Sequence, residues 1–138
     1  MTKQEFMAMS LPYGLKVILS TENRNYKKGS IYAYSYQLAH DSYKNNKAKV
    51  DLCTPIINPL SNLTKEIEHN GEKFVPIDLL RQDGYYIGED WIIENFKDVE
   101  NSSFGFIQKL IKWHFDIANL IEKGEAIDVN SLNENPYK

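Results

Sequence analysis

The last third of the chain carries the feature that most constrains its fold, an apolar stripe at helical spacing. The members of this stripe are Ile107, Leu110, Ile111, His114, Ile117, Ala118, Leu120 and Ile121. They recur three or four residues apart, as residues on one face of a helix do. Ser103 offers an N-cap and Gly124 a left-handed stop, so the pattern predicts an amphipathic helix from Ser103 to Lys123. A helix with so wide an apolar face is not stable alone in water and must pack on a sheet.

Alternating residues in the first half of the chain predict the strands of that sheet. Leu15 to Leu19 has the period of a strand, and Ser30 to Leu38 repeats it, with Tyr32, Tyr34, Tyr36 and Leu38 on one face. The polar stretch Thr21–Gly29 separates the two segments, which predicts a hairpin. A polar loop, His40 to Lys47, then leads to a third strand, Val50 to Cys53. The prolines of Pro55–Pro59 argue against ladder pairing beyond that point.

Shorter signals predict the remaining elements. Thr2 and Glu5 form a capping box for a helix over Lys3–Ser10. Asn70-Gly71 predicts a hairpin, and the alternative is a short helical turn capped by Ser61 or Thr64. The other predicted elements are a helical turn over Ile77–Gln82, a short helix over Gly88–Lys97, a terminal strand over Ala126–Val129 and a frayed tail from Asn130 to Lys138. The result is one α+β domain over residues 1–138, an antiparallel sheet with one long C-terminal amphipathic helix packed across it.

Composition excludes several classes of protein. The 138 residues are 42% hydrophobic, which is enough for a core and excludes a purely disordered chain. The net charge of −3 excludes a polycation built for nucleic acid. No apolar run approaches the roughly 18 residues of a membrane helix, and the first residues lack a leader pattern, so we expect a soluble cytoplasmic protein with no membrane association. The single cysteine, Cys53, forms neither an internal disulfide nor a structural zinc site.

Candidate catalytic groups are sparse. His40, His69 and His114 lie in three different predicted elements without metal-ligand spacing. A buried, inert Cys53 thiol is the favoured interpretation over a nucleophile. Two pairs of neighbouring carboxylates, Glu66 with Glu68 and Glu89 with Asp90, are better explained as solvated faces than as acid/base pairs. The sequence therefore predicts no catalytic residue, no metal and no cofactor, and the chain is interpreted as not an enzyme.

Two charged surfaces remain as candidate binding sites. The basic and aromatic candidate comprises Arg24, Tyr26, Lys27, Lys28, Tyr32, Tyr34, Tyr36, Tyr43, Lys44, Lys47 and Lys49. Such a surface holds single-stranded RNA or DNA by base stacking and phosphate attraction, but the favoured alternative is that the tyrosines pack under the long helix and the lysines keep the loops soluble. The acidic candidate comprises Asp83, Glu89, Asp90, Glu94, Asp98 and Glu100. It presents carboxylates where a partner would hold phosphates, and a plain solvated face is again the favoured alternative.

Three blocks of the sequence carry a resemblance to a known family. They are LPYGLKV at Leu11–Val17, INPLSNLTKEIEHNGEKFVPIDLL at Ile57–Leu80, and KWHFDIANLIEKGEAIDVNSL at Lys112–Leu132. As a set they resemble a family of small phage and prophage proteins that carries no established activity, so no site residue is transferred from it. The resemblance implies a phage accessory protein that inhibits host defence. Its sharpest version is an anti-CRISPR protein acting on an RNA-guided, RNA-targeting nuclease.

These observations lead to three functional hypotheses. The first is a phage protein that binds a host protein or nucleoprotein complex, such as a CRISPR effector with its guide RNA, in the host-cell cytoplasm. The second is a small RNA- or DNA-binding phage factor that uses the tyrosine strand directly. The third is a virion or assembly component. The sequence specifies neither the partner, the step inhibited nor the oligomeric state.

One stability prediction follows from the apolar stripe. Leu110→Ala should lower the free energy of unfolding by on the order of 2–5 kcal/mol, because it leaves a cavity at the centre of the stripe. Urea unfolding of the variant and the wild type measures this difference. A loss below about half a kcal/mol, typical of an exposed site, would place Leu110 outside the core.

Overall fold

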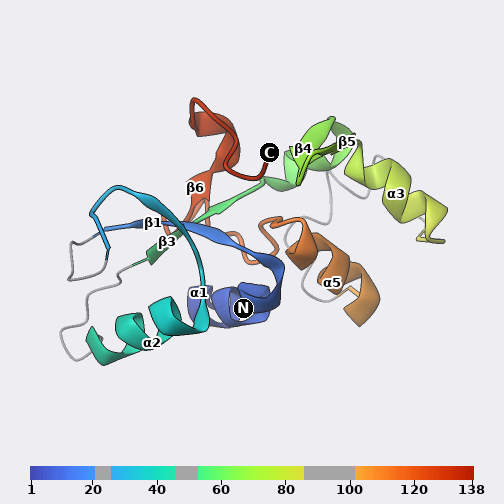
Figure 1. The fold of residues 1–138 in the computed structure, drawn as a ribbon. Helices are drawn as coiled ribbons and strands as arrows, with labels where there is room; N and C mark the ends of the chain where they lie inside the picture. The colour runs from blue at the N-terminus through green and yellow to red at the C-terminus, as the bar shows by residue number, and fades with distance from the viewer. Residues whose placement is uncertain (21–25, 46–52, 86–101) are drawn as a thin grey trace.

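A mixed four-stranded sheet forms the centre of the protein, with helices packed on it (Figure 1). The computed structural model describes residues 1–20, 26–45, 53–85 and 102–138. The strand order is β2 (Ile31–Ala33), β1 (Lys16–Leu19), β3 (Cys53–Ile57) and β6 (Ile127–Asp128). The β1 strand pairs antiparallel with β2 and β3, whereas β6 runs parallel to β3. The α+β class and the β1–β2 hairpin are confirmed, but the sheet is mixed and not wholly antiparallel.

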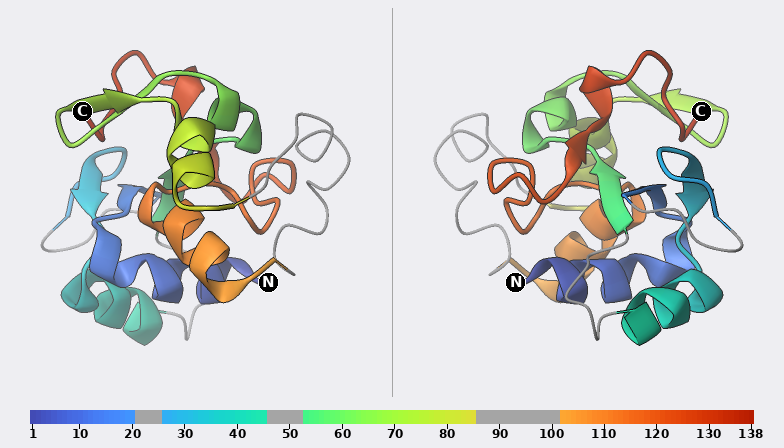
Figure 2. Two further views of the ribbon diagram at one scale, coloured as in Figure 1. Left: turned by 90° about the vertical axis from the view of Figure 1, so that its right-hand side faces the viewer. Right: turned by 90° about the vertical axis from the view of Figure 1, so that its left-hand side faces the viewer.

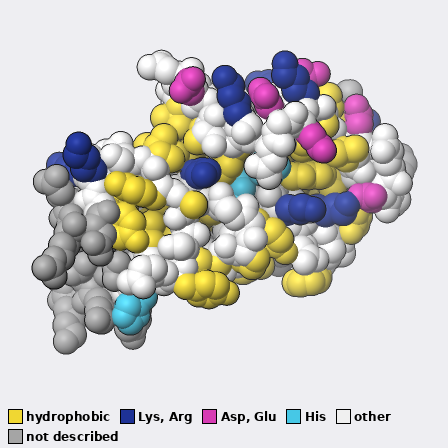
Figure 3. Space-filling view, in the orientation of Figure 1, with side chains coloured by type: hydrophobic (Ala, Val, Ile, Leu, Met, Phe, Trp, Pro, Cys, Tyr) yellow, Lys and Arg dark blue, Asp and Glu magenta, His cyan; other side chains and the backbone are white. Residues whose placement is uncertain are grey.

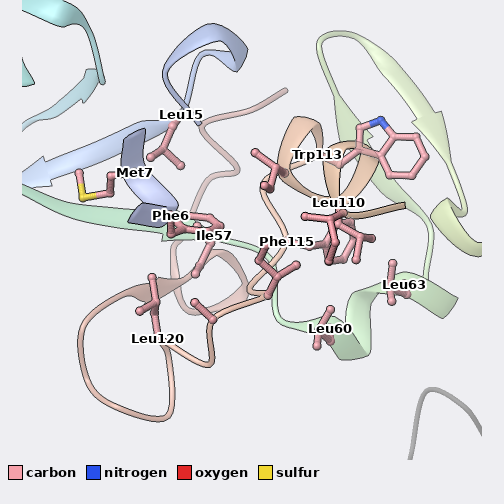
Figure 4. Packing of buried hydrophobic residues seen from close by; sticks show 14 of the residues in the cluster. Phe6, Met7, Leu15, Ile57, Leu60, Leu63, Leu110, Trp113, Phe115 and Leu120 are labelled. Atoms are coloured by element: carbon pink, nitrogen blue, oxygen red, sulfur yellow. The ribbon is translucent and has the colours of Figure 1, made fainter. Parts of the chain in front are cut away.

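Helix α1 (Lys3–Ser10) begins where the capping box predicts. The backbone N–H of Glu5 donates to the Thr2 hydroxyl oxygen at 3.1 Å, which satisfies one of the unpaired donors of the first turn. Phe6 is fully buried and Met7 is nearly so. Both side chains point into the core beneath the sheet (Figure 4).

The predicted strand Ser30–Leu38 is shorter than expected, because a helix begins within it. After β2 the chain enters α2 (Tyr36–Asn45), which also replaces much of the predicted polar loop. The Ser35 hydroxyl oxygen accepts the backbone N–H of Leu38 at 3.2 Å, the geometry of an N-cap. Leu38 is buried, but it reaches the core as a residue of this helix and not of a strand. The N-cap serine outweighed the strand alternation around it.

Strand β3 runs through Pro55, so the expectation that the prolines forbid pairing is wrong. The backbone N–H of Leu19 donates to the carbonyl of Ser30, and the carbonyl of Leu15 accepts the N–H of Tyr34. The backbone polar groups of the odd-numbered residues of β1 therefore point toward β2. Pro55 lies opposite Val17, and antiparallel pairs alternate, so its nitrogen points away from β1. Pairing with β6 begins one residue later, at Ile56. The missing N–H therefore removes no bond to β1.

The predicted long helix is also wrong, because α5 (Phe104–Lys112) ends after nine residues. His114 has φ 60°. The N–H of His114 donates to Ile111 at 2.9 Å and that of Phe115 to Leu110 at 2.9 Å, which is a Schellman motif with histidine at the left-handed position. Beyond this stop the residues of the stripe stay largely buried, but in an irregular segment. The apolar stripe therefore predicted the core residues correctly but predicted too long a helix.

The core lies between α1, the sheet, α5 and a short 3₁₀ helix, Leu60–Thr64 (Figure 4). Side chains from distant parts of the chain meet there, including Phe6, Ile57, Leu110 and Phe115, all fully buried. Leu110 is in the centre of this cluster, as its predicted effect on stability requires.

The Asn70-Gly71 hairpin is confirmed as β4 (Ile67–His69) paired with β5 (Glu72–Phe74). The turn residues have φ 52° and φ 83°, both left-handed, as a two-residue hairpin of this kind requires. A 3₁₀ helix, Leu60–Thr64, precedes the hairpin, but its N-cap is Pro59 and neither Ser61 nor Thr64 caps it as the alternative expected. Helix α3 (Pro76–Gln82) follows as predicted. The predicted helix Gly88–Lys97 lies outside the described residues.

The C-terminal tail packs against the fold, which contradicts the expected fraying from Asn130 onward. Tyr137 is only 4% exposed. Its hydroxyl accepts the backbone N–H of Lys16 at 2.8 Å and donates to the carbonyl of Ile56 at 2.6 Å. It thereby bridges β1 and β3 one residue beyond their last pair, Val17 with Pro55. The Asn135 side-chain amide also donates to the carbonyl of Glu68 at 2.8 Å.

Removal of the Tyr137 hydroxyl tests this bridge. Tyr137→Phe should lower the free energy of unfolding by about 1–3 kcal/mol, because it leaves a partly buried N–H and a buried carbonyl without partners. Tyr36→Phe is the matched control, since Tyr36 is 78% exposed, and it should change stability by less than about half a kcal/mol. Equal stabilities for the two variants in urea unfolding would show that the tail is not stabilised by this hydroxyl.

Candidate binding surface

The connection from β1 to β2 carries two exposed lysines, Lys27 and Lys28. They lie between Tyr26 and Tyr32 in the chain, and the centroids of these two tyrosine rings are 5.0 Å apart with the rings nearly perpendicular. The backbone N–H of Lys27 donates to the Tyr32 hydroxyl at 3.0 Å. Tyr32 therefore holds the turn that presents the two ammonium groups. We call Lys27, Lys28 and this tyrosine pair the basic tip.

The structure divides the predicted tyrosine strand. Tyr32 and Tyr34 are half-buried and pack against the core, although the long helix expected to cover them is absent from the described residues. Tyr36 instead lies at the start of α2 and is 78% exposed. Tyr43 and Lys44 belong to the same helix, and the positions of their side chains are not described. Arg24, Lys47 and Lys49 lie outside the described residues.

A second feature of this end of the molecule was missed by sequence reasoning. Ile31 is 44% exposed and Ala33 is exposed, although both lie in β2. The sequence signal for it is the alternation of Ser30–Leu38, which places Ile31 and Ala33 on the face opposite the tyrosines. In the space-filling view, Lys or Arg side chains lie beside hydrophobic surface at the end where β1 and β2 meet (Figure 3).

Of the predicted acidic surface, only Asp83 is described. It follows α3 and forms an ion pair with Lys109 of α5. Its carboxylate is therefore partly neutralised within the protein. Glu89, Asp90, Glu94, Asp98 and Glu100 lie outside the described residues, so the acidic surface stays a prediction.

The structure brings together two of the three histidines that the sequence left apart. The rings of His69 and His114 are 5.4 Å apart between centroids, and His114 stacks on Tyr137 at 4.3 Å. His114 is fully buried, and neither ring nitrogen has a hydrogen-bond partner among the described groups. Burial lowers the pKa of His114 to about 3, with the charges of His69 and Lys16 adding to the effect. A neutral imidazole in an aromatic stack is a packing element and a poor general base at neutral pH.

The other candidate chemical groups are dispersed. His40 is exposed on α2, and Cys53 is buried in β3. Within the described ranges, no three histidine, cysteine or carboxylate side chains gather as a metal site would require. These positions give no support to a catalytic centre.

Glu66 and Glu68 line a cleft of about 170 Å³ together with Asn58, Asn62, Lys65, Ile67, Val129, Asn130 and Asn135. The asparagine amides are engaged with one another and with the backbone. Asn62 donates to Asn58 and to Asn130 at 3.1 Å each, and Asn58 donates to the carbonyl of Trp113 at 2.9 Å. This network ties the 3₁₀ helix to the C-terminal segments, so its polar atoms serve the fold.

Comparison with models of protein families, with curated proteins and with solved structures finds no match for this chain. None of the helices in the described ranges has the length and apolar character that a membrane crossing requires. The geometry of the basic tip and its surroundings is therefore the basis for a functional proposal.

The buried imidazole makes stability depend on pH. In the unfolded chain His114 titrates near its usual pKa of about 6.5, whereas in the fold its pKa is about 3. The unfolded state therefore takes up the proton first as the pH falls below about 6.5. The free energy of unfolding should decrease by on the order of 2 kcal/mol between pH 7 and pH 5.

Urea unfolding at the two pH values measures this loss. His114→Asn is the matched variant, because asparagine tolerates the left-handed backbone and does not titrate. It should show a clearly shallower decrease in stability with acidification. An identical pH dependence in the variant and the wild type would contradict a buried neutral His114.

Proposed function

We propose that this chain is a non-enzymatic phage accessory protein that binds a host nucleoprotein, such as a CRISPR effector with its guide RNA, through the basic tip. One observation carries the proposal: two exposed lysines, Lys27 and Lys28, directly precede a strand in which Ile31 is 44% exposed. Large exposed apolar side chains are typical of the centres of protein interfaces. Ammonium groups beside them attract an anionic partner and set its orientation.

The proposal favours a protein-containing partner over free RNA or DNA. Stacking of bases requires open aromatic faces. Tyr26 and Tyr32 are half-buried and pack edge to face, and the Tyr32 hydroxyl is already hydrogen-bonded within the turn. Tyr36 alone is largely exposed among the described tyrosines of the predicted surface. A single exposed ring supports a mixed protein interface better than a stacking platform.

The test is affinity purification of the tagged protein from infected host cells, with captured protein and RNA both identified. The variant Lys27→Glu with Lys28→Glu should lose about tenfold or more of the capture, because two attractive contacts become repulsive. Its matched control is Lys65→Glu with Lys73→Glu, which reverses two exposed lysines, one shortly before β4 and one in β5, at the opposite end of the molecule (Figure 1). The control should capture as much partner as the wild type.

Salt and stability measurements separate binding from folding. Capture by the wild type should weaken as salt rises, because exposed charges are screened. Both double variants should keep the wild-type free energy of unfolding within about half a kcal/mol per site. Equal capture by the wild type and both double variants would show that the basic tip is not the interface. Binding of RNA or DNA by the isolated protein would favour a direct nucleic-acid binder.

A further inference from the structure

Strand β2 forms one outer edge of the sheet, and its backbone polar groups alternate in direction. In the sheet, β1 lies on one side of β2 and no described strand lies on the other, and Figure 2 shows β2 at the margin of the molecule. Tyr34 donates to Leu15 and Leu19 donates to Ser30 across the β1–β2 pair. Because antiparallel pairs alternate, Tyr32 bonds to Val17, whereas Ile31 and Ala33 direct their N–H and C=O groups outward.

The outward groups of Ile31 and Ala33 form an incomplete ladder. Among the residues that the structure places, none pairs with this side of β2. An edge with free donors and acceptors is a template on which another extended chain adds as a strand. The side chains beside it are small or apolar, since Ala33 is exposed and Ile31 is 44% exposed.

Positively charged side chains lie next to the N-terminal end of this edge. Lys27 and Lys28 precede β2 and are exposed, and neither forms an ion pair with a described carboxylate. Tyr36, which is 78% exposed, already belongs to α2 and not to this edge. A chain lying along the edge would therefore meet two ammonium groups and then a short apolar stretch.

We propose that the β2 edge binds an extended, acidic segment of a partner protein by β-strand addition. The choice of this face rests on the proposed function, and the inference specifies what the partner contributes to it. The segment forms backbone hydrogen bonds with Ile31 and Ala33, places apolar side chains beside Ile31, and presents carboxylates to Lys27 and Lys28.

Two other occupants fit the edge less well. A second copy of the chain would bring the same two lysines to the interface, and lysines at an edge disfavour pairing of like edges. A nucleic acid would satisfy the lysines, but its sugar–phosphate backbone lacks the alternating N–H and C=O groups that the edge offers. An acidic polypeptide satisfies both the charges and the backbone groups.

The decisive variant is Ala33→Pro, which deletes an outward N–H. That N–H makes no bond to β1, and proline is tolerated on edge strands where the N–H faces outward. Ala33→Ser is the matched control, because it keeps the N–H at the same position. The probe is a displayed library of random dodecapeptides, panned against the wild-type protein, with the enriched peptides then synthesised and titrated.

We expect the enriched peptides to be acidic and to contain alternating apolar residues. Their affinity should fall about tenfold for Ala33→Pro, since the loss of one interface hydrogen bond and its strand register is worth about that factor. Affinity for Ala33→Ser should stay close to that of the wild type. If Ala33→Pro fails to fold, amide hydrogen exchange on the wild type replaces it. Exchange at Ile31 and Ala33 should then slow when an enriched peptide is added.

Several results would overturn the inference. They are the absence of any enriched peptide, enrichment of basic or unpatterned peptides, equal binding by Ala33→Pro, or unchanged exchange at Ile31 and Ala33. Binding of an RNA homopolymer without any peptide binding, or dimerisation of the chain through this edge, would also overturn it. The Lys27→Glu, Lys28→Glu variant separates the two proposals. If it loses the peptides while Ala33→Pro retains them, charge-based docking stands and strand addition fails. If both variants bind as the wild type does, the basic tip is not the docking surface for these peptides.

Discussion

The Tyr137 hydroxyl joins the end of the chain to its beginning. It accepts from Lys16 and donates to Ile56, and so continues the β1–β3 ladder where the two backbones no longer pair directly. Burial raises the pKa of Tyr137 and keeps its proton in place for this bridge. The ring also stacks on His114. Through this one residue, the sheet, the turn after α5 and the C-terminal segment become parts of a single packed unit.

The turn at His114 explains why the C-terminal third is compact and not one rod. A left-handed residue ends α5, and the chain then returns to the sheet. The backbone N–H of Asn58 donates to the carbonyl of His114 at 2.7 Å, and the backbone N–H of Asp116 donates to the carbonyl of Asn58 at 2.9 Å. The Asp116 carboxylate next accepts the N–H groups of Leu120 and Ile121, which starts a new short turn. The apolar stripe is thus folded back on the core at the cost of burying an imidazole whose nitrogens have no described partner.

The basic tip and the β2 edge differ from this interior in what they leave exposed. Elsewhere in the described chain, buried asparagines and the terminal tyrosine are hydrogen-bonded. At β2 the backbone groups of Ile31 and Ala33 and the Ile31 side chain face outward, and the two exposed lysines lie in the turn just before this strand. Exposed apolar side chains beside unpaired strand atoms are costly for an isolated protein, because they favour association. Their presence at one end is the physical reason for placing the interface there.

The sequence by itself determined the elements that depend on local chemistry. The capping box at Thr2, the Asn70-Gly71 turn and the alternation of Leu15, Val17 and Leu19 each specified a nearby backbone state. The apolar stripe identified core residues such as Leu110. Only the tertiary structure decided that the stripe breaks at His114, because a Schellman turn and the bridge to Asn58 outweigh helical spacing. It also decided that the tail docks, that β6 runs parallel to β3, and that two histidines meet. Each depends on contacts between residues far apart in the chain, and these leave no periodic or capping signal in the sequence.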